Sequence, residues 1–276
     1  MNALNDLTVT SWWWVRHAPV TTHRGRLYGQ SDVPANTDDA EAFKGLAEQL
    51  PAGALWVASH LQRTHQTANA IVEAGHQAPA PLIEEDLAEQ SFGDWQGLSY
   101  AEVEAERAGA DHPFWIAPAD FAAPGGESFA AVMTRVSDTV SRLSTHHTGR
   151  DIVAVAHGGS IRAALGHALG ITPHQALPFT VDNLSITRID CFHSANGSQD
   201  WCVVGVNLPP SKSAPHGVVF PPRRWVREAG DTLLRERQSG AAPATVNGEA
   251  APFSRWSNPA RATGSRCCRE GEGARL

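Results

Sequence analysis

Short apolar runs alternate with amphipathic segments along the first 210 residues, and this alternation constrains the fold more than any other feature of the chain. The apolar runs predict strands, and segments with an apolar residue every three or four positions predict helices. We expect strands over 11–15, 54–59, 151–156, 185–192 and 201–206, a strand or extended loop over 82–84, and helices over 38–50, 62–74, 128–144 and 160–169. Such alternation indicates an α/β fold, a three-layer sandwich with a mostly parallel central sheet and helices on both faces.

Two details refine this prediction. No helical pattern separates the last two strands, so we expect them to add as an antiparallel pair at one edge of the sheet. Three consecutive tryptophans, Trp12 to Trp14, fall within the first strand. In a sheet covered on both faces, they are expected to be buried core residues rather than a binding surface.

The alternation ends near Pro210, and the charge changes there as well. The first 210 residues carry 11 basic and 23 acidic side chains, whereas residues 211–276 carry 11 basic and 6 acidic ones. The last 66 residues contain only nine Leu, Ile, Val or Phe, too few to bury the apolar surface that would offset the entropy lost on ordering. We therefore expect one folded domain over 1–210 and a disordered basic tail over 211–276.

Composition excludes several kinds of partner. The acidic body lacks the field of Lys and Arg that nucleic-acid binding needs, and no apolar run is long enough to span a membrane. The N-terminal residues lack a signal-peptide pattern, and the four cysteines form no C-x-x-C pair, so we expect a cytoplasmic protein. No Cys or carboxylate completes a ligand set with His60 and His65 or with His146 and His147, so we expect neither metal nor cofactor.

Two histidines stand directly after predicted strands. The pair Arg16-His17 follows the first strand, and His157 follows the strand at 151–156. In parallel sheets, ligands bind at the carboxyl ends of the strands, so these side chains would meet if the two strands are neighbours. Taken singly, each histidine would more often be an ordinary loop or surface residue.

Five motifs in a fixed order connect these histidines to a known family. They are VRHAPV, SHLQRTHQTA, LAEQSFGDWQG, PGGESF and AVAHGGSIRAAL. Together they resemble the histidine phosphatase superfamily, also called the phosphoglycerate mutase-like family, and the stretch GRLYGQSDVP resembles its alpha-ribazole phosphatase-like members. The resemblance implies a phosphoglycerate mutase-like fold, a catalytic domain over 1–210, and metal-independent cleavage of phosphate monoesters.

The resemblance also assigns chemical roles to five residues. It implies that His17 attacks phosphorus and becomes phosphorylated, and that Glu89 protonates the leaving oxygen and later activates water. Arg16, Arg63 and His157 would hold the phosphoryl oxygens, a task that suits permanently charged guanidinium groups.

Further residues are expected at the edge of the site. Gly158 opens a helix whose backbone N–H groups could help to hold an anion. His23 stands where the family often has a phosphate-binding Asn, and Arg26 and Tyr28 lie on the alpha-ribazole phosphatase-like stretch, so these three are expected substrate binders. Glu127, in the fourth motif, is expected to order the rim of the site rather than to perform chemistry.

The leading hypothesis is hydrolysis of a small-molecule phosphate ester. The segment between Gly97 and Glu127 would form the roof of the site; it is short, and its only basic residue is Arg107, which favours hydrolysis over phosphoglycerate mutase chemistry. A mutase remains the first alternative, and a non-catalytic phosphate-binding module is the second. A third alternative gives the basic tail the task of holding RNA or an acidic surface. The sequence does not specify the substrate or the oligomeric state.

Overall fold

A six-stranded sheet forms the centre of the fold, with strand order β3-β2-β4-β1-β5-β6. The computed structural model describes residues 8–210 except 108, 110 and 111, so the tail expected over 211–276 lies outside the described residues. The strands are β1 (Thr8–Arg16), β2 (Leu55–Ala58), β3 (Leu82–Ile83), β4 (Asp151–Ala156), β5 (Ile186–His193) and β6 (Gln199–Leu208).

The sheet is mixed in the way the sequence predicts. Strands β3, β2, β4 and β1 run parallel, whereas β5 pairs antiparallel with β1, and β6 pairs antiparallel with β5. The last two strands thus extend one edge, and the ambiguous segment near residue 82 forms a two-residue strand at the other edge.

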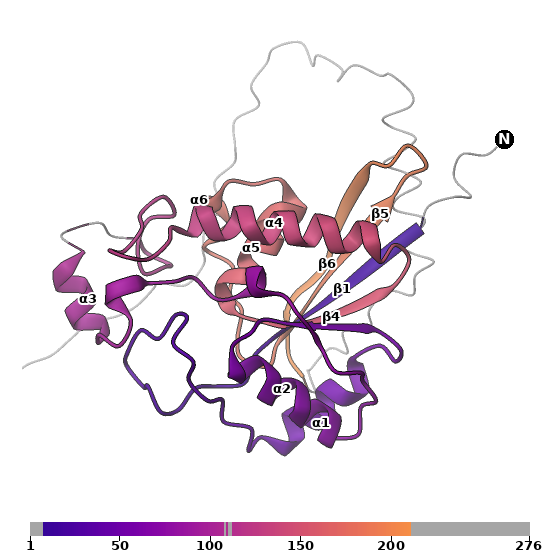
Figure 1. Cartoon of the computed structure of the whole chain (residues 1–276), viewed down its shortest axis with the longest axis horizontal. Coiled ribbons are helices and arrows are strands. Elements are labelled where there is room, and N and C mark those ends of the chain that lie inside the picture. The colour runs from indigo at the N-terminus through magenta and orange to yellow at the C-terminus, as the bar shows by residue number, and fades with distance from the viewer. Residues whose placement is uncertain (1–7, 108, 110–111, 211–276) are drawn as a thin grey trace, which may run out of the picture. The chain divides into compact units, whose positions relative to one another are not determined.

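Helices cover both faces of the sheet, so the predicted α/β sandwich is confirmed (Figure 1). The α-helices are α1 (Ala40–Gln49), α2 (Gln62–Glu73), α3 (Tyr100–Glu106), α4 (Phe129–His146), α5 (Gly158–Leu169) and α6 (Pro173–Ala176); the 3-10 turns are η1 (Glu85–Leu87) and η2 (Gly93–Trp95). The short helices α3 and α6 were not predicted from the sequence. Each begins with a capping box, Ser99 with Glu102 and Thr172 with Gln175, which is a local signal for a helix start.

The tryptophans of β1 show how the layers are filled. Trp12 and Trp14 point to one face, where they stack with ring centroids 5.1 Å apart in the core cluster beneath α4 and α5. Trp13 points to the opposite face and packs in the core cluster with α1 and α2. All three side chains are buried, as expected, because successive residues of a strand alternate between two covered faces.

The pairing of β1 with β4 positions the functional residues. The two strands lie side by side and parallel, with Arg16 opposite Ala156. The residues that follow, His17 and His157, therefore emerge at the same edge of the sheet, and the His17 N–H donates to the carbonyl of Ala156 over 3.0 Å. The expected meeting of the two histidines is thus explained by strand order.

Candidate active site

His17 lies immediately beyond β1, and its side chain is only 1% exposed. Its Nδ1 is 2.7 Å from the carbonyl oxygen of Ala18. Because a carbonyl only accepts hydrogen bonds, Nδ1 carries the proton and Nε2 keeps a free lone pair. Burial lowers the pKa of His17 well below its usual value, the charges of Arg63 and Arg16 lower it further, and the Ala18 carbonyl partly opposes them. The imidazole is therefore neutral and suited to nucleophilic attack.

His157 caps the start of α5 and faces His17, with ring centroids 5.1 Å apart. Its Nε2 lies 2.7 Å from the Ser59 hydroxyl oxygen, and its Nδ1 accepts from Nε of Arg63 over 3.3 Å. Since arginine only donates, the proton of His157 resides on Nε2. Burial, followed by the nearby charges, lowers the pKa of His157 well below its usual value. A bond from His157 to a phosphoryl oxygen would replace one of these partners, so that role stays a prediction.

Arg63 is fully buried on the first turn of α2. Its Nη1 donates to the carbonyl of Ser31 and its Nη2 to the carbonyl of Gly29, over 2.9 and 2.6 Å. The guanidinium carbon also lies 5.2 Å from the ring centroid of Tyr28. Arg63 therefore fixes the loop that carries Tyr28 against the site, and both predicted binders are brought together there.

Arg16 presents an unsatisfied donor to the start of α5. Its Nη1 donates to the carbonyl of Val181 over 2.6 Å, whereas its buried Nε has no hydrogen-bond partner among the residues described. A Cβ placed on Gly158 would lie 3.6 Å from that Nε. Leaving a buried, charged N–H without a partner is costly, so this group is poised for an anion. The structure thus places Arg16 and Gly158 together, as predicted.

Glu89 approaches the same helix start from the segment after η1. Its Oε1 accepts from the backbone N–H of Gln90 over 2.9 Å and from that of Gly159 over 3.0 Å. Its Oε2 has only a longer contact of 3.3 Å with the Gly159 N–H, which leaves this oxygen more available for proton transfer. A Cβ at Gly159 would collide with Oε1, so the close approach requires glycine here.

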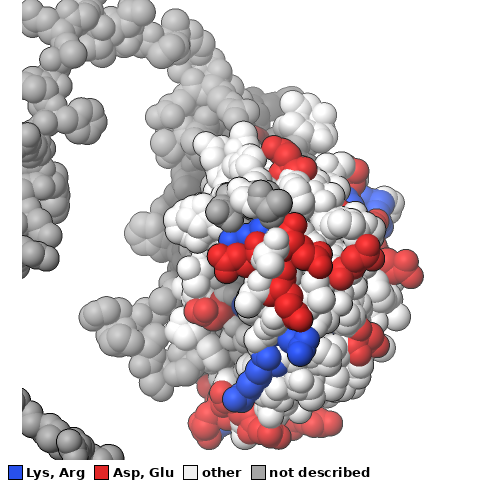
Figure 2. Space-filling view, turned by 90° about the vertical axis from the view of Figure 1, so that its left-hand side faces the viewer, with Lys and Arg blue, Asp and Glu red and all other residues white. Residues whose placement is uncertain are grey.

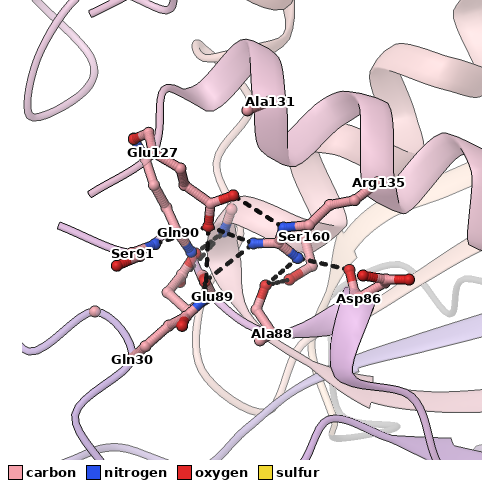
Figure 3. A network of polar contacts seen from close by, with 12 residues as sticks. Gln30, Asp86, Ala88, Glu89, Gln90, Ser91, Glu127, Ala131, Arg135 and Ser160 are labelled. Carbon is pink, nitrogen blue, oxygen red and sulfur yellow. Dashed lines mark hydrogen bonds and ion pairs between the residues drawn. The ribbon is translucent and has the colours of Figure 1, made fainter. Parts of the chain in front are cut away.

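The segment that carries Glu89 is held by Arg135 of α4, which forms an ion pair with Glu127 (Figure 3). Arg135 lies 2.8 Å from Glu127 and also donates to the carbonyl oxygens of Asp86, Ala88 and Glu89, over 2.6, 2.9 and 3.1 Å. Glu127, expected to order the rim, thus acts together with an arginine that the sequence analysis missed.

Two predicted binders lie apart from this cluster. His23 Nδ1 lies 3.0 Å from the Thr22 hydroxyl oxygen, and Arg26 donates to the carbonyl of Gly97 over 2.7 Å. Arg26 is also 3.9 Å from Glu102 on α3. Within the described chain, neither His23 nor Arg26 has a hydrogen bond or ion pair with the five predicted catalytic residues, so their binding of substrate stays a prediction.

Three further residues reach the site without having been predicted. Ser59 bonds His157, and the side-chain N–H of Asn183 donates to the carbonyl of His17 over 2.7 Å. Arg162 lies one turn after Gly158 on α5, and this spacing places both on the same face of the helix. Ser59 opens the second motif and Arg162 lies within the fifth, which were the available signals; the contact of Asn183 depends on tertiary structure.

The charge of the pocket contrasts with that of the surface. Seen from the side where α3 lies, most charged side chains on the face of the molecule are acidic (Figure 2). The site instead gathers cationic side chains, and among the residues described neither Arg16 nor Arg63 forms an ion pair with a carboxylate. Such a cluster of cationic groups favours a small anionic ligand.

In the part of the chain that the structure describes, no cluster of three or more His, Cys, Asp or Glu side chains has an arrangement that could hold a metal ion. No helix among these residues is long and apolar enough to cross a membrane.

Several known proteins are similar to this chain. The bifunctional protein Rv2228c of Mycobacterium tuberculosis is 36% identical over 113 residues, which cover 41% of this chain but only 30% of that protein. A glucosyl-3-phosphoglycerate phosphatase of Mycolicibacterium vanbaalenii is 35% identical over 170 residues, 57% of this chain and 73% of that one. The adenosylcobalamin/alpha-ribazole phosphatase of Escherichia coli is 28% identical over 182 residues, 64% of this chain and 88% of that one.

Structural comparison agrees with the sequence matches. The native structure of the mycobacterial glucosyl-3-phosphoglycerate phosphatase Rv2419c superposes with a TM-score of 0.60 and 27% identity, covering 72% of this chain and 99% of that one. The family model of the histidine phosphatase superfamily (branch 1) matches residues 12–203, a range that contains every predicted catalytic residue. The resemblance noted in the motifs is thereby confirmed: the chain belongs to the histidine phosphatase superfamily.

Proposed function

We propose that this chain is a metal-independent phosphomonoesterase that hydrolyses a small phosphorylated metabolite through a phosphohistidine on His17. The observation that carries the proposal is the Nδ1 bond from His17 to Ala18, because it leaves the Nε2 lone pair free on an imidazole that burial and the nearby Arg63 and Arg16 keep neutral by lowering its pKa. The phosphatase names of the relatives support an enzyme of this type. Family membership and site geometry thus favour the same chemistry.

In the proposed first step, Nε2 of His17 attacks phosphorus in line with the ester oxygen. The N–P bond forms, the P–O bond breaks, and Oε2 of Glu89 supplies the proton that the leaving alcohol needs. Negative charge on the equatorial oxygens is held by the unpartnered Nε of Arg16 and the remaining N–H groups of Arg63. Holding the reactants in this arrangement provides much of the rate acceleration.

In the proposed second step, water takes the place of the departed alcohol. Glu89, now ionised, accepts a proton from this water as its oxygen attacks phosphorus. The N–P bond breaks with its electron pair returning to Nε2, so inorganic phosphate leaves and His17 is again neutral. Each group therefore ends the cycle in the protonation state in which it began.

The roof supports hydrolysis over the mutase alternative. Arg107, its only basic side chain between Gly97 and Glu127, donates to the carbonyl of Ile116 and lies 3.7 Å from Glu104. It is thus engaged with the roof itself. We also propose residues 1–210 as the catalytic domain, since β6, the last strand described, ends at Leu208.

A phosphatase screen over a broad panel of metabolites tests this proposal. The wild type should release phosphate in the presence of chelators, and His17→Ala should be inactive. A trapped phosphoenzyme should be labile to acid and stable to alkali, whereas the reverse stability would indicate an acyl phosphate or a phosphate ester. Tight phosphate binding without any hydrolysis would favour a binding module, and isomerisation of phosphoglycerates faster than phosphate release would favour a mutase.

A further inference from the structure

A second arginine flanks the start of α5, beside the proposed phosphoryl pocket. A Cβ placed on Gly158 would lie 3.0 Å from Nη1 of Arg162 and 3.6 Å from Nε of Arg16. The two guanidinium groups therefore approach one point from different elements, α5 and the end of β1. Two like charges held this close repel one another unless an anion lies between or beside them.

Arg162 is rigidly oriented, but its outer nitrogens are free. Its Nε donates to the carbonyl oxygens of Phe179 and Leu177, over 2.8 and 3.2 Å. In the described part of the chain, its Nη groups have no hydrogen-bond partner and it forms no ion pair. Burial lowers the pKa of Arg162 to about 10, which still leaves the side chain charged at neutral pH.

The nearest carboxylates are already engaged. Glu89 and Asp182 both act electrostatically on Arg162, yet neither comes within ion-pair distance. Glu89 accepts from the Gly159 N–H, and Asp182 accepts from the side-chain N–H of Asn207 over 2.8 Å. A half-buried guanidinium loses part of its hydration, and without a carboxylate partner this loss is not compensated. A bound anion would compensate it.

Trp115 links this arginine to the residue that follows Glu89. The guanidinium carbon of Arg162 lies 4.6 Å from the centroid of the indole ring. The indole N–H of Trp115 donates to the side chain of Gln90 over 2.8 Å, and Gln90 directly follows the proposed acid Glu89. The pair of Arg162 and Trp115 is therefore tied, through Gln90, to the segment that carries Glu89.

We propose that Arg162, stacked on Trp115, binds a second acidic group on the alcohol part of the substrate. The substrate class is then a phosphate monoester that also carries a carboxylate or another phosphate a few bonds from the ester oxygen. This inference rests on the proposed phosphatase function and deepens it. The fork of Nη groups suits either acidic group, since both accept two parallel hydrogen bonds.

Matched substrate pairs test the inference. Phosphoserine carries a carboxylate where phosphoethanolamine has hydrogen, and 3-phosphoglycerate carries one where glycerol 3-phosphate has a hydroxymethyl group. Fructose 1,6-bisphosphate compared with fructose 6-phosphate tests a second phosphate. For the wild type, we expect kcat/KM to be about 10- to 100-fold higher for the more acidic member, either in the two carboxylate pairs or in the phosphate pair. This factor corresponds to the free energy of a hydrogen bond to a charged group. Arg162→Met should remove this preference, so that the ratio of kcat/KM between the two members of a pair falls to about one.

Two further variants keep the result interpretable. Arg150, whose contact of 3.4 Å with the carbonyl of Gly53 lies at the opposite end of β4, offers the control Arg150→Met, which should retain the preference. Trp115→Leu keeps the Nε bonds of Arg162 but removes its stacking partner, and should weaken the preference even if Arg162→Met is too unstable to assay. Thermal unfolding of each variant checks that its fold is retained.

The outcomes separate this inference from the proposed function. If Arg162→Met lowers kcat/KM equally for both members of every pair, Arg162 holds the transferred phosphoryl group. If the wild type shows no preference, it recognises no second anion. Either result overturns the inference. His17→Ala provides the separate check. If it retains turnover on nitrophenyl phosphate, the phosphohistidine mechanism fails, whatever Arg162 does.

Discussion

Arg135 and Glu127 form an ion pair of 2.8 Å, and the same guanidinium donates hydrogen bonds to the carbonyl oxygens of residues 86, 88 and 89. Both ionic side chains are about four-fifths buried, at 18% and 20% exposure. Neither contacts the proposed nucleophile. The pair therefore acts by positioning the carboxylate of Glu89 against α5, where its Oε1 meets the N–H of Gly159.

Replacing Arg135 should impair proton delivery more than phosphoryl transfer. We expect Arg135→Met to lower kcat for an alkyl phosphate by about 10- to 100-fold, the cost of misplacing a catalytic group by roughly 1 Å. The loss on nitrophenyl phosphate should be much smaller, because that leaving group hardly needs an acid. Steady-state kinetics on both substrates measures the difference.

Arg142 supplies the matched control on the same helix. It is 47% exposed and pairs with Glu84, the residue before η1, over 2.7 Å. Arg142→Met therefore removes an ion pair of α4 but leaves the bonds of Arg135 to the carbonyl oxygens of residues 86, 88 and 89 in place. Its activity should equal that of the wild type on both substrates. Equal losses on the two leaving groups in Arg135→Met would contradict the positioning role.

Gly159→Ala should displace the same carboxylate from the other side. The added Cβ would collide with Oε1 of Glu89, so either the carboxylate or the first turn of α5 must shift. We expect kcat for alkyl phosphates to fall by about 100-fold, within the usual contribution of a general acid, with a smaller loss on nitrophenyl phosphate. A variant that keeps full activity on alkyl esters would show that Glu89 does not need this contact.

The residues in the motifs could be predicted because each follows a recognisable strand or opens a recognisable helix. His17 and His157 are examples, since their meeting requires only that β1 and β4 be neighbours. Arg135 could not be found in this way. Its bonds reach carbonyl oxygens 46 to 49 residues away, and no local pattern of the sequence encodes a contact of that length.

The short elements were missed for a different reason. Helix α3 spans only Tyr100–Glu106 and has one buried residue, Val103, so it has too few turns to show an apolar stripe. The antiparallel edge strands were predictable, because β5 is rich in β-branched and aromatic residues, β6 contains the apolar run 201–206, and no helical period separates them. Length and burial together thus decide which elements a sequence reveals.

The two buried histidines should remain neutral in mildly acidic solution. Burial, together with Arg63 and Arg16, lowers the pKa of His17, and burial with Arg63 lowers that of His157. In an NMR titration of the imidazole nitrogens, both should still be neutral at about pH 6, where an ordinary histidine is mostly protonated. Arg63→Met should raise both pKa values; if they do not move, the guanidinium charge does not contribute to holding these rings neutral.

The same shifts make the stability of the fold depend on pH. The unfolded chain binds protons at these histidines below about pH 6.5, whereas the native state does not. Their contribution to the free energy of unfolding is therefore fully present above that pH and is lost as the pH falls, at up to about 1.4 kcal/mol per pH unit for each histidine. Urea unfolding at about pH 7.5 and pH 5.5 should show a smaller drop for His157→Gln than for the wild type, while the exposed His60→Gln should match the wild type.

Ser59 should fix the orientation of His157. Its hydroxyl oxygen lies 2.7 Å from Nε2 of His157, and Ser59→Ala leaves that buried N–H without this partner. We expect the free energy of unfolding to fall by about 1–3 kcal/mol, the usual cost of an unsatisfied buried polar group. We also expect kcat/KM to fall by about tenfold, and by the same factor on alkyl and nitrophenyl phosphates, because His157 faces the proposed nucleophile His17 and has no hydrogen bond with the proposed acid Glu89. Ser141 makes a similar contact, 3.3 Å, with His167 away from the site, so Ser141→Ala is the matched control and should keep full activity. If Ser59→Ala and Ser141→Ala behave alike in kinetics, the Ser59 bond contributes to packing alone and does not orient the second histidine.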